Sequence, residues 1–321
     1  MFRLFDEAKY DVLQNTKIAF IIAAVFTLPG LLLLAIRGPN PSIEFTGGTL
    51  VELRALDQSI QTQDIRAALD QGGIVGAEIQ SFGSSNEFVI RARLESDDPA
   101  AETTQQTRDA IQAALTGAFG ADGFEIGRAD AIGPKVGGEL RTRAQLALLL
   151  AFGAIFIFIW FRYEWRFGMA AVLATVHDIL TTIAFISYMN LEISLVVVAG
   201  LLTIIGYSLN DTIVTFDRVR ENLRKFRRNN IYEILNRSIN ETLPRTMLTS
   251  GTTLAATIAL LVLGGKVISG FAWVMTFGVI TGTFSSIFIA SPILLAIERR
   301  WPGEDVRGAK TLDKSGAAVV T

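Results

Sequence analysis

Long apolar runs constrain this chain more than any other feature of its sequence. A helix needs about 20 consecutive apolar residues to cross the hydrocarbon core of a bilayer. Helices are also one of the few structures that keep every backbone polar group paired in lipid. Runs of this length recur along the chain and predict six membrane-spanning helices. They cover residues 17–36, 142–161, 168–189, 193–216, 247–264 and 270–297.

The composition agrees with a membrane protein and excludes several classes of site. Of 321 residues, 50% are hydrophobic and only 19% are charged, which is too apolar for an ordinary soluble domain. The absence of cysteine excludes disulfides, thiolate catalysis and cysteine-based metal sites, and a single histidine excludes a histidine-rich one. We therefore expect no bound metal, no organic cofactor and no enzymatic active site.

The distribution of lysine and arginine predicts the orientation of the spans. Basic residues gather before the first span, between the second and third, and between the fourth and fifth, whereas the opposite short loops offer only Lys266. Because basic loops stay on the cytoplasmic side, we expect residues 1–16 and 301–321 to be cytoplasmic and residues 37–141 to lie outside. The first span does not resemble a cleaved signal, since sixteen residues precede it and its apolar run is too long.

The outer segment, residues 37–141, has the pattern of a small α+β domain. Its predicted order is βαββαβ, which suggests a ferredoxin-like split βαβ sheet with helices on one face. The pair Gly47 and Gly48 marks a close backbone approach at its start, and residues 132–140 form either a hinge or a rigid turn. A docking surface and a plain spacer are equally good interpretations of this domain. The predicted strands and helices cover residues 49–54, 62–71, 75–82, 87–93, 99–119 and 124–132.

The fourth apolar run contains Asn210 and Asp211, and this is the strongest functional signal in the chain. An ionised carboxylate at the centre of a membrane helix costs about 2.5–3.5 kcal/mol on insertion scales, so such residues usually face a bundle interior or a wet cavity. Helical spacing places Asp211 on one stripe with Tyr207, Thr215 and Arg218. Asp211 is therefore a candidate proton carrier, although structural hydrogen bonding to a neighbouring span is the simpler alternative.

The fifth span supplies a cationic partner for this acid. Its predicted start at Pro244 is followed by Arg245, with Thr249 and Thr253 on the same helical face. A cytoplasmic hairpin joins the fourth and fifth spans, so Arg245 and Asp211 should lie at comparable depth and could form an ion pair. Movement of the guanidinium would then change the proton affinity of the carboxylate. A fixed bridge, or a pair between Asp211 and Arg218, is the alternative.

Two further spans carry polar or small residues. His177 and Asp178 lie near the middle of the third span, where they form either a proton relay or a static hydrogen-bonded pair. Gly278 and Gly282 in the sixth span allow close helix packing, against this chain or a partner.

The remaining cytoplasmic segments are predicted from charge and composition. The basic loop 217–246, which includes Asp217, has an apolar stripe of Val219, Leu223 and Phe226, and we expect it to lie on anionic lipids. Positive-inside bias explains its arginines, so we expect no nucleic-acid binding. The tail 301–321 looks disordered.

Several of these motifs together resemble bacterial SecF. They are EFTGGTLVEL (44–53), IGPKVGGEL (132–140), the VHD of the third span, GYSLNDTIVTFDRVREN (206–222) and LPRTMLTSGTTL (243–254). They follow that family's order and spacing across nearly the whole chain, and together they are highly specific. One departure is Glu44, where the family more often has aspartate.

The resemblance implies a fold, partners and a mechanism. It implies an RND-type half of six spans in the bacterial inner membrane, which pairs with SecD and associates with the SecYEG channel and YajC. Such a complex uses proton flow to help draw preproteins across the membrane, with Asp211 as proton carrier and Arg245 as its charged partner. Tyr207, Asn210, Thr215, Asp217, Thr249 and Thr253 would support that pair. The rival interpretation is proton-coupled efflux of small molecules, which normally needs larger outer domains.

Overall fold

The structure of the protein is a computed structural model that describes residues 9–57, 59–74, 76–81, 86–92, 104–226 and 228–301. The chain divides into two compact units. One comprises Met1–Asn40 with Ala147–Thr321 and contains most of the helices, and the other is Pro41–Leu146. The predicted tail beyond Trp301 lies outside the described residues.

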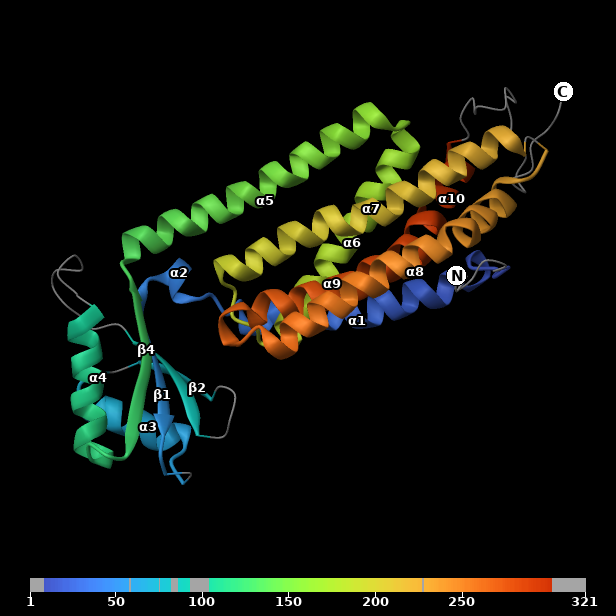
Figure 1. The fold of residues 1–321 in the computed structure, drawn as a ribbon. Coiled ribbons are helices and arrows are strands. Elements are labelled where there is room, and N and C mark those ends of the chain that lie inside the picture. The colour runs from blue at the N-terminus through green and yellow to red at the C-terminus, as the bar shows by residue number, and fades with distance from the viewer. Residues whose placement is uncertain are drawn as a thin grey trace. The chain divides into compact units, whose positions relative to one another are not determined.

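The helical unit confirms a polytopic membrane protein. Among the described residues, six helical segments are long and apolar enough to span a bilayer, and α1 and α6–α10 run side by side (Figure 1). The last span is divided at Ile289 into two helices. The helices are α1 (Thr16–Arg37), α5 (Pro134–Arg162), α6 (Trp165–Tyr188), α7 (Leu195–Lys225), α8 (Ile231–Leu263), α9 (Lys266–Phe288) and α10 (Ala290–Arg300).

The region between the fourth and fifth spans differs from the prediction. Most of the expected loop 217–246 is helical, because α7 continues to Lys225 and α8 begins at Ile231, which leaves Pro244 inside α8. Val219 and Leu223 are buried in the main hydrophobic core of the bundle and do not form a lipid-facing stripe. The same amphipathic period serves a helix that packs on protein and one that lies on a bilayer. Sequence periodicity could not separate the two.

Small residues bring α7 and α9 together. A Cβ atom added to Gly278 would clash with the side chain of Ile204, and one added to Gly282 would lie 3.1 Å from Cβ of Ser208, which is tighter than most contacts of this kind. The two helices therefore approach closely at these positions. The glycine pair of the sixth span therefore packs within this chain.

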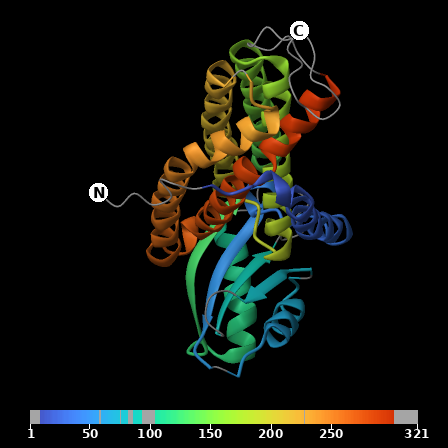
Figure 2. The same cartoon turned by 90° about the vertical axis from the view of Figure 1, so that its right-hand side faces the viewer.

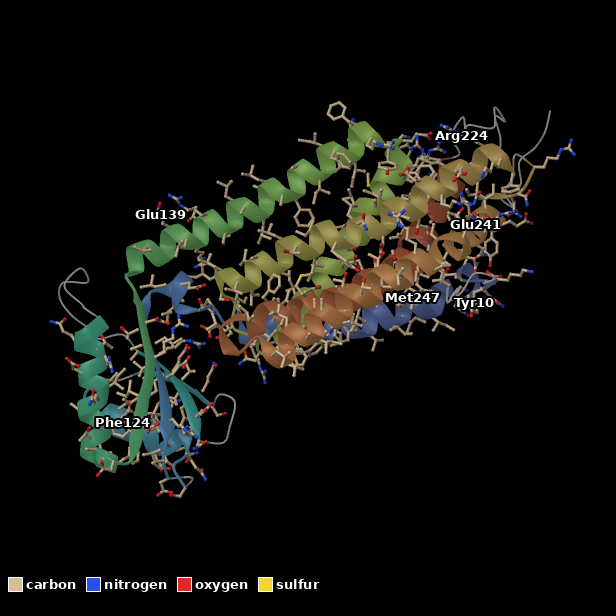
Figure 3. The ribbon with its side chains drawn as sticks, in the orientation of Figure 1. Tyr10, Phe124, Glu139, Arg224, Glu241 and Met247 are labelled. Carbon is tan, nitrogen blue, oxygen red and sulfur yellow. The ribbon has the colours of Figure 1, made fainter. Side chains whose placement is uncertain are left out.

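The segment before α1 is held against the start of α8. The side chain of Asn240 donates to the carbonyl of Tyr10 at 2.8 Å and accepts from its N–H at 2.9 Å. One turn earlier, Asn236 accepts from the N–H of Leu13 at 3.1 Å and donates to Asp11 at 2.8 Å. In Figure 3, Tyr10 lies at the same end of the bundle as the labelled Glu241 of α8 and Arg224 of α7. The N-terminal segment thus fixes one end of α8.

The unit Pro41–Leu146, which is the predicted outer domain, contains in its described residues a four-stranded sheet in the order β2-β3-β1-β4, and all three neighbouring pairs are antiparallel. Helices α3 and α4 pack on one face of it (Figure 2), and Val51, Ile90 and Ile111 are completely buried between them. Part of the predicted helix 99–119 lies outside the described residues. The elements are α2 (Ile43–Thr46), β1 (Gly48–Ala55), α3 (Thr62–Gln71), β2 (Glu78–Ser81), β3 (Glu87–Ala92), α4 (Thr104–Phe119) and β4 (Phe124–Ile132).

The glycine pair at the start of β1 has a conformational reason. Gly47 has φ +71° and Gly48 has φ +123°, backbone conformations that residues with side chains rarely adopt. Gly137, in the first turn of α5, packs on this turn, because a Cβ there would lie 2.9 Å from the nitrogen of Gly47. The predicted hinge at 132–140 is therefore a packed start of α5, which favours the rigid alternative.

Candidate proton-carrying site

The polar stripe of α7 faces α8, and Asp211 is at its centre. The Asp211 side chain is buried, and one of its carboxylate oxygens accepts a hydrogen bond from the Ser250 hydroxyl at 3.3 Å. One turn away on either side, the hydroxyl of Tyr207 donates to Ser250 at 3.3 Å and that of Thr215 lies 3.4 Å from the hydroxyl of Thr242. This arrangement places the carboxylate inside the bundle, away from lipid.

Ser250 connects three helices at this site, and its role was not predicted from the sequence. Besides Asp211 and Tyr207 of α7, its hydroxyl contacts Thr283 of α9, which donates to it at 2.7 Å. Ser250 belongs to a buried face of α8 that includes Thr246 and is rotated by about 100° from the predicted stripe. Hydroxyl residues follow both faces of this helix, so their spacing alone did not identify the packed one.

Arg245 lies on the predicted face of α8 and is exposed. Within the described part of the chain, the guanidinium of Arg245 makes no ion pair with Asp211 within 4.0 Å, although it attracts the carboxylate from a longer distance. Thr249 and Thr253 are half-buried, and Thr253 donates to the carbonyl of Thr249 at 2.9 Å. The structure therefore brings Asp211 together with hydroxyl groups and leaves its predicted cationic partner free to approach.

The other predicted members of the α7 stripe lie apart from the carboxylate. Asn210 is exposed, on a different side of the helix from Asp211. Arg218 pairs with Glu241 at 2.7 Å and with Glu221, so the alternative pair with Asp211 does not form. Asp217 lies 3.6 Å from Arg220, toward the C-terminal end of α7.

The tyrosine between α5 and α6 packs on this end of α7. Tyr163 is buried, and Arg220 lies over its ring at 5.5 Å from the ring centre. Burial, assisted by the negative charge of Asp217, raises the pKa of Tyr163 to about 12. The phenol therefore remains neutral at physiological pH.

The third span contributes a second polar cluster. Asp178 of α6 is completely buried, and Nδ1 of His177 lies 2.9 Å from one of its carboxylate oxygens. The hydroxyl of Ser208 on α7 donates to the other oxygen. The geometry is compatible with both predicted interpretations, a relay and a static pair.

The chemistry available at these positions is proton exchange. A buried carboxylate surrounded by hydroxyls can take up or release a proton, and its hydrogen bonds stabilise the ionised form. Among the residues that the structure describes, no group of three or more histidine and acidic side chains is placed to hold a metal ion. The site holds carboxylate and hydroxyl oxygens from α7, α8 and α9.

Two family models match the chain. Residues 111–300 match the C-terminal region of the protein export membrane proteins SecD/SecF, and residues 32–55 match the SecD/SecF GG motif. The second match contains Gly47 and Gly48, and the first contains all the membrane residues discussed above.

Similar proteins cover nearly the whole chain. The protein translocase subunit SecF of Gemmatimonas aurantiaca is 48% identical over 100% of this chain and 97% of its own length. That of Desulfurispirillum indicum is 44% identical over 86% of this chain and 88% of its own length.

Among solved structures, SecDF of Thermus thermophilus, described as a translocon-associated membrane protein, matches with a TM-score of 0.79 and 33% identity over 92% of this chain. A second SecDF structure, in a super-membrane-facing form, matches with a TM-score of 0.66. This chain spans 39% of the first SecDF chain and 40% of the second. The matched family regions, the full-length relatives and the shared fold agree, and the chain belongs to the SecF protein translocase subunits of the SecD/SecF family.

Proposed function

We propose that this chain is an accessory subunit of the Sec preprotein translocase that pairs with a SecD-like chain and uses the proton motive force to assist protein export. The observation that carries the proposal is Asp211, a carboxylate buried among hydroxyls inside a membrane bundle. Each charge that crosses the membrane releases about 2.3 kcal/mol per 100 mV of potential. Proton passage through such a site can therefore drive a conformational change.

Pairing with a SecD-like chain is supported by the polar groups that the bundle leaves uncovered. Asn210 of α7 and both Arg245 and Thr252 of α8 are exposed. Polar side chains at membrane depth usually face protein or water, so a second helical chain is a suitable cover for this side of α7 and α8. Approach of Arg245 to Asp211 would then depend on how the two chains pack.

The proposal also includes the fold of residues 37–141, the orientation of the chain in the membrane and its further partners. The sheet order β2-β3-β1-β4, with two helices on one face, supports a ferredoxin-like domain for residues 37–141. Its placement in the periplasm, with both termini in the cytoplasm and the spans in the inner membrane, rests on the distribution of basic residues. SecYEG, YajC, the translocating preprotein and anionic lipids are the further partners in this proposal. Small-molecule efflux is less favoured, because the full-length relatives are named as translocase subunits.

The test is the effect of Asp211→Asn on export into membrane vesicles that contain the assembled complex, with and without a proton gradient. We expect the gradient-dependent part of export to disappear while the ATP-driven part remains, because the amide cannot carry a proton. Glu221→Gln is the matched control, since Glu221 is a carboxylate of the same helix that pairs with Lys225 at the cytoplasmic end. Gradient-dependent export that survives in Asp211→Asn would refute the proposal.

A further inference from the structure

Asp178 is a second buried carboxylate that the proposed site does not use. It lies in α6 and is 0% exposed, and its two oxygens contact Nδ1 of His177 and the hydroxyl of Ser208. Ser285 of α9 is also completely buried beside it. In the described part of the chain, no lysine or arginine lies within 4.0 Å of this carboxylate, so His177 is the titratable group that faces it.

The charge of this pair follows from its surroundings. An ionised carboxylate without a counter-ion is costly in a medium of low polarity. A carboxylic acid beside a neutral imidazole, and a carboxylate beside an imidazolium, are both neutral overall. They differ only in whether the proton lies on the Asp178 oxygen or on Nδ1 of His177. The pair therefore favours the state in which the acid and the imidazole share this proton.

The imidazole is the end of the pair that can exchange protons. The His177 side chain is 19% exposed, whereas that of Asp178 is 1% exposed. Nε2 of His177 lies 3.4 Å from the hydroxyl of Thr181, which in turn lies 2.8 Å from the hydroxyl of Thr27 on α1. Release of a proton from Nε2 of the imidazolium leaves a carboxylate beside a neutral imidazole whose Nδ1–H still donates to it. The pair then carries one negative charge.

Ser208 connects this pair to the helix turn that bears Asp211. Ser208 precedes Asp211 by three residues in α7, and Gly282 of α9 packs directly on it. A hydrogen bond to an ionised group is roughly twice as strong as one between neutral groups. The strength of the hydrogen bond from Ser208 to Asp178 therefore depends on how many protons the His177–Asp178 pair carries and where they lie.

We propose that His177 and Asp178 form a second proton-exchanging pair, which acts through Ser208 on the position of the α7 turn that carries Asp211. The proposal rests on the proton-coupled function above and deepens it. The pair exchanges its proton through Nε2 of His177, and Asp178 transmits the change in charge to α7. Asp178 and Ser208 are positioning residues in this scheme, and Asp211 remains the carrier.

The direct test is infrared difference spectroscopy on the full chain with its SecD-like partner in lipid vesicles, titrated from about pH 5 to about pH 9, the range in which histidine changes charge. The spectra are recorded in an Asp211→Asn background, so that Asp211 contributes no signal. We expect a pH-dependent carboxyl signal that is lost in Asp178→Asn and moves to a different pH in His177→Gln. If Asp178→Asn does not assemble, His177→Gln alone supplies the comparison. A carboxyl signal that is constant with pH, or unchanged in the variants, would show a static pair.

The functional test uses the same variants with Asp211 restored. Groups that transfer protons contribute about 10²–10⁴-fold to rates, so we expect His177→Gln to reduce gradient-dependent export at least about tenfold and to alter its pH profile. Ser208→Ala should keep a pH-dependent carboxyl signal, moved to higher pH because the lost hydrogen bond stabilised the carboxylate, and should reduce export because it removes the link to α7. Export that keeps its pH profile in His177→Gln would contradict the inference. Failure of the proposed function is distinguishable, because it would appear as normal gradient-dependent export in Asp211→Asn.

Discussion

Removal of the Ser250 hydroxyl should change the pH dependence of export. Ser250→Ala takes away the 3.3 Å hydrogen bond to Asp211 and also the acceptor used by Tyr207 and Thr283. Hydrogen bonds to charged groups contribute about 1.5–3 kcal/mol, and the length of this one favours the lower value. Because about 1.4 kcal/mol corresponds to one pH unit, loss of this hydrogen bond should shift the midpoint of the pH profile of export by about one unit. The bond stabilises the ionised carboxylate, so without it the acid holds its proton at higher pH.

The assay is gradient-dependent export into vesicles at a series of pH values. The midpoint of the pH profile should move upward by about one unit in Ser250→Ala and return toward the parent value in Ser250→Thr, which keeps a hydroxyl. Thr203→Ala is the control, because the exposed Thr203 hydroxyl donates to a carbonyl of its own helix. An unchanged midpoint in a fully assembled Ser250→Ala complex would refute the assignment of Ser250 to the site.

Three further predictions concern packing and charge. Gly278→Val should destabilise the bundle by about 1–3 kcal/mol, measured as thermal unfolding in detergent, and Ile204→Ala should recover part of the loss because Ile204 occupies the space. Arg166→Met should cost about 3–5 kcal/mol, since it breaks the 2.6 Å ion pair between the buried side chains of Arg166 and Glu298; a small change would contradict the importance of this buried pair. The hydrogen bond from Tyr232 lowers the pKa of Asp11 below its ordinary 3.8, so this contact should stabilise fully above about pH 4 and be lost in stronger acid. Asp11→Asn should remove this dependence, measured as proteolysis of the N-terminal segment across that range.

The membrane architecture and the central acid could be predicted because both depend on local sequence. A run of about 20 apolar residues has few alternatives to a spanning helix, and an aspartate within one is conspicuous whatever its neighbours. The strands and helices of the outer domain lie largely where alternation and helical periodicity indicated. Their antiparallel order is a tertiary property, and the sequence suggested it only through the βαββαβ order.

The contacts of the site could not be predicted, because they depend on how helices rotate against one another. A rotation of about 100° separates Arg245 from Thr246 on α8, and hydroxyl residues follow both faces. In the structure, the face of α8 that contains Ser250 packs on α7 and α9. The prediction that Val219 lies on lipid was wrong for a related reason. Its amphipathic spacing is equally typical of a helix that packs on protein and of one that lies on a bilayer. Asn210 and Arg245 are exposed in this single chain, and the proposed SecD-like partner would cover them.

The contact between Gly47 and Gly137 limits where the outer domain can move. Residues 134–146 of α5 belong to the same compact unit as the sheet, and at 1.5 Å per residue they form a stem about 20 Å long. If this stem tilts, the whole sheet should tilt with it, because Gly47 before β1 packs on Gly137 in the first turn of α5. Bending is therefore expected at the unit boundary, in the middle of α5 and near Asn40. Rigidifying the middle of α5 should therefore slow export.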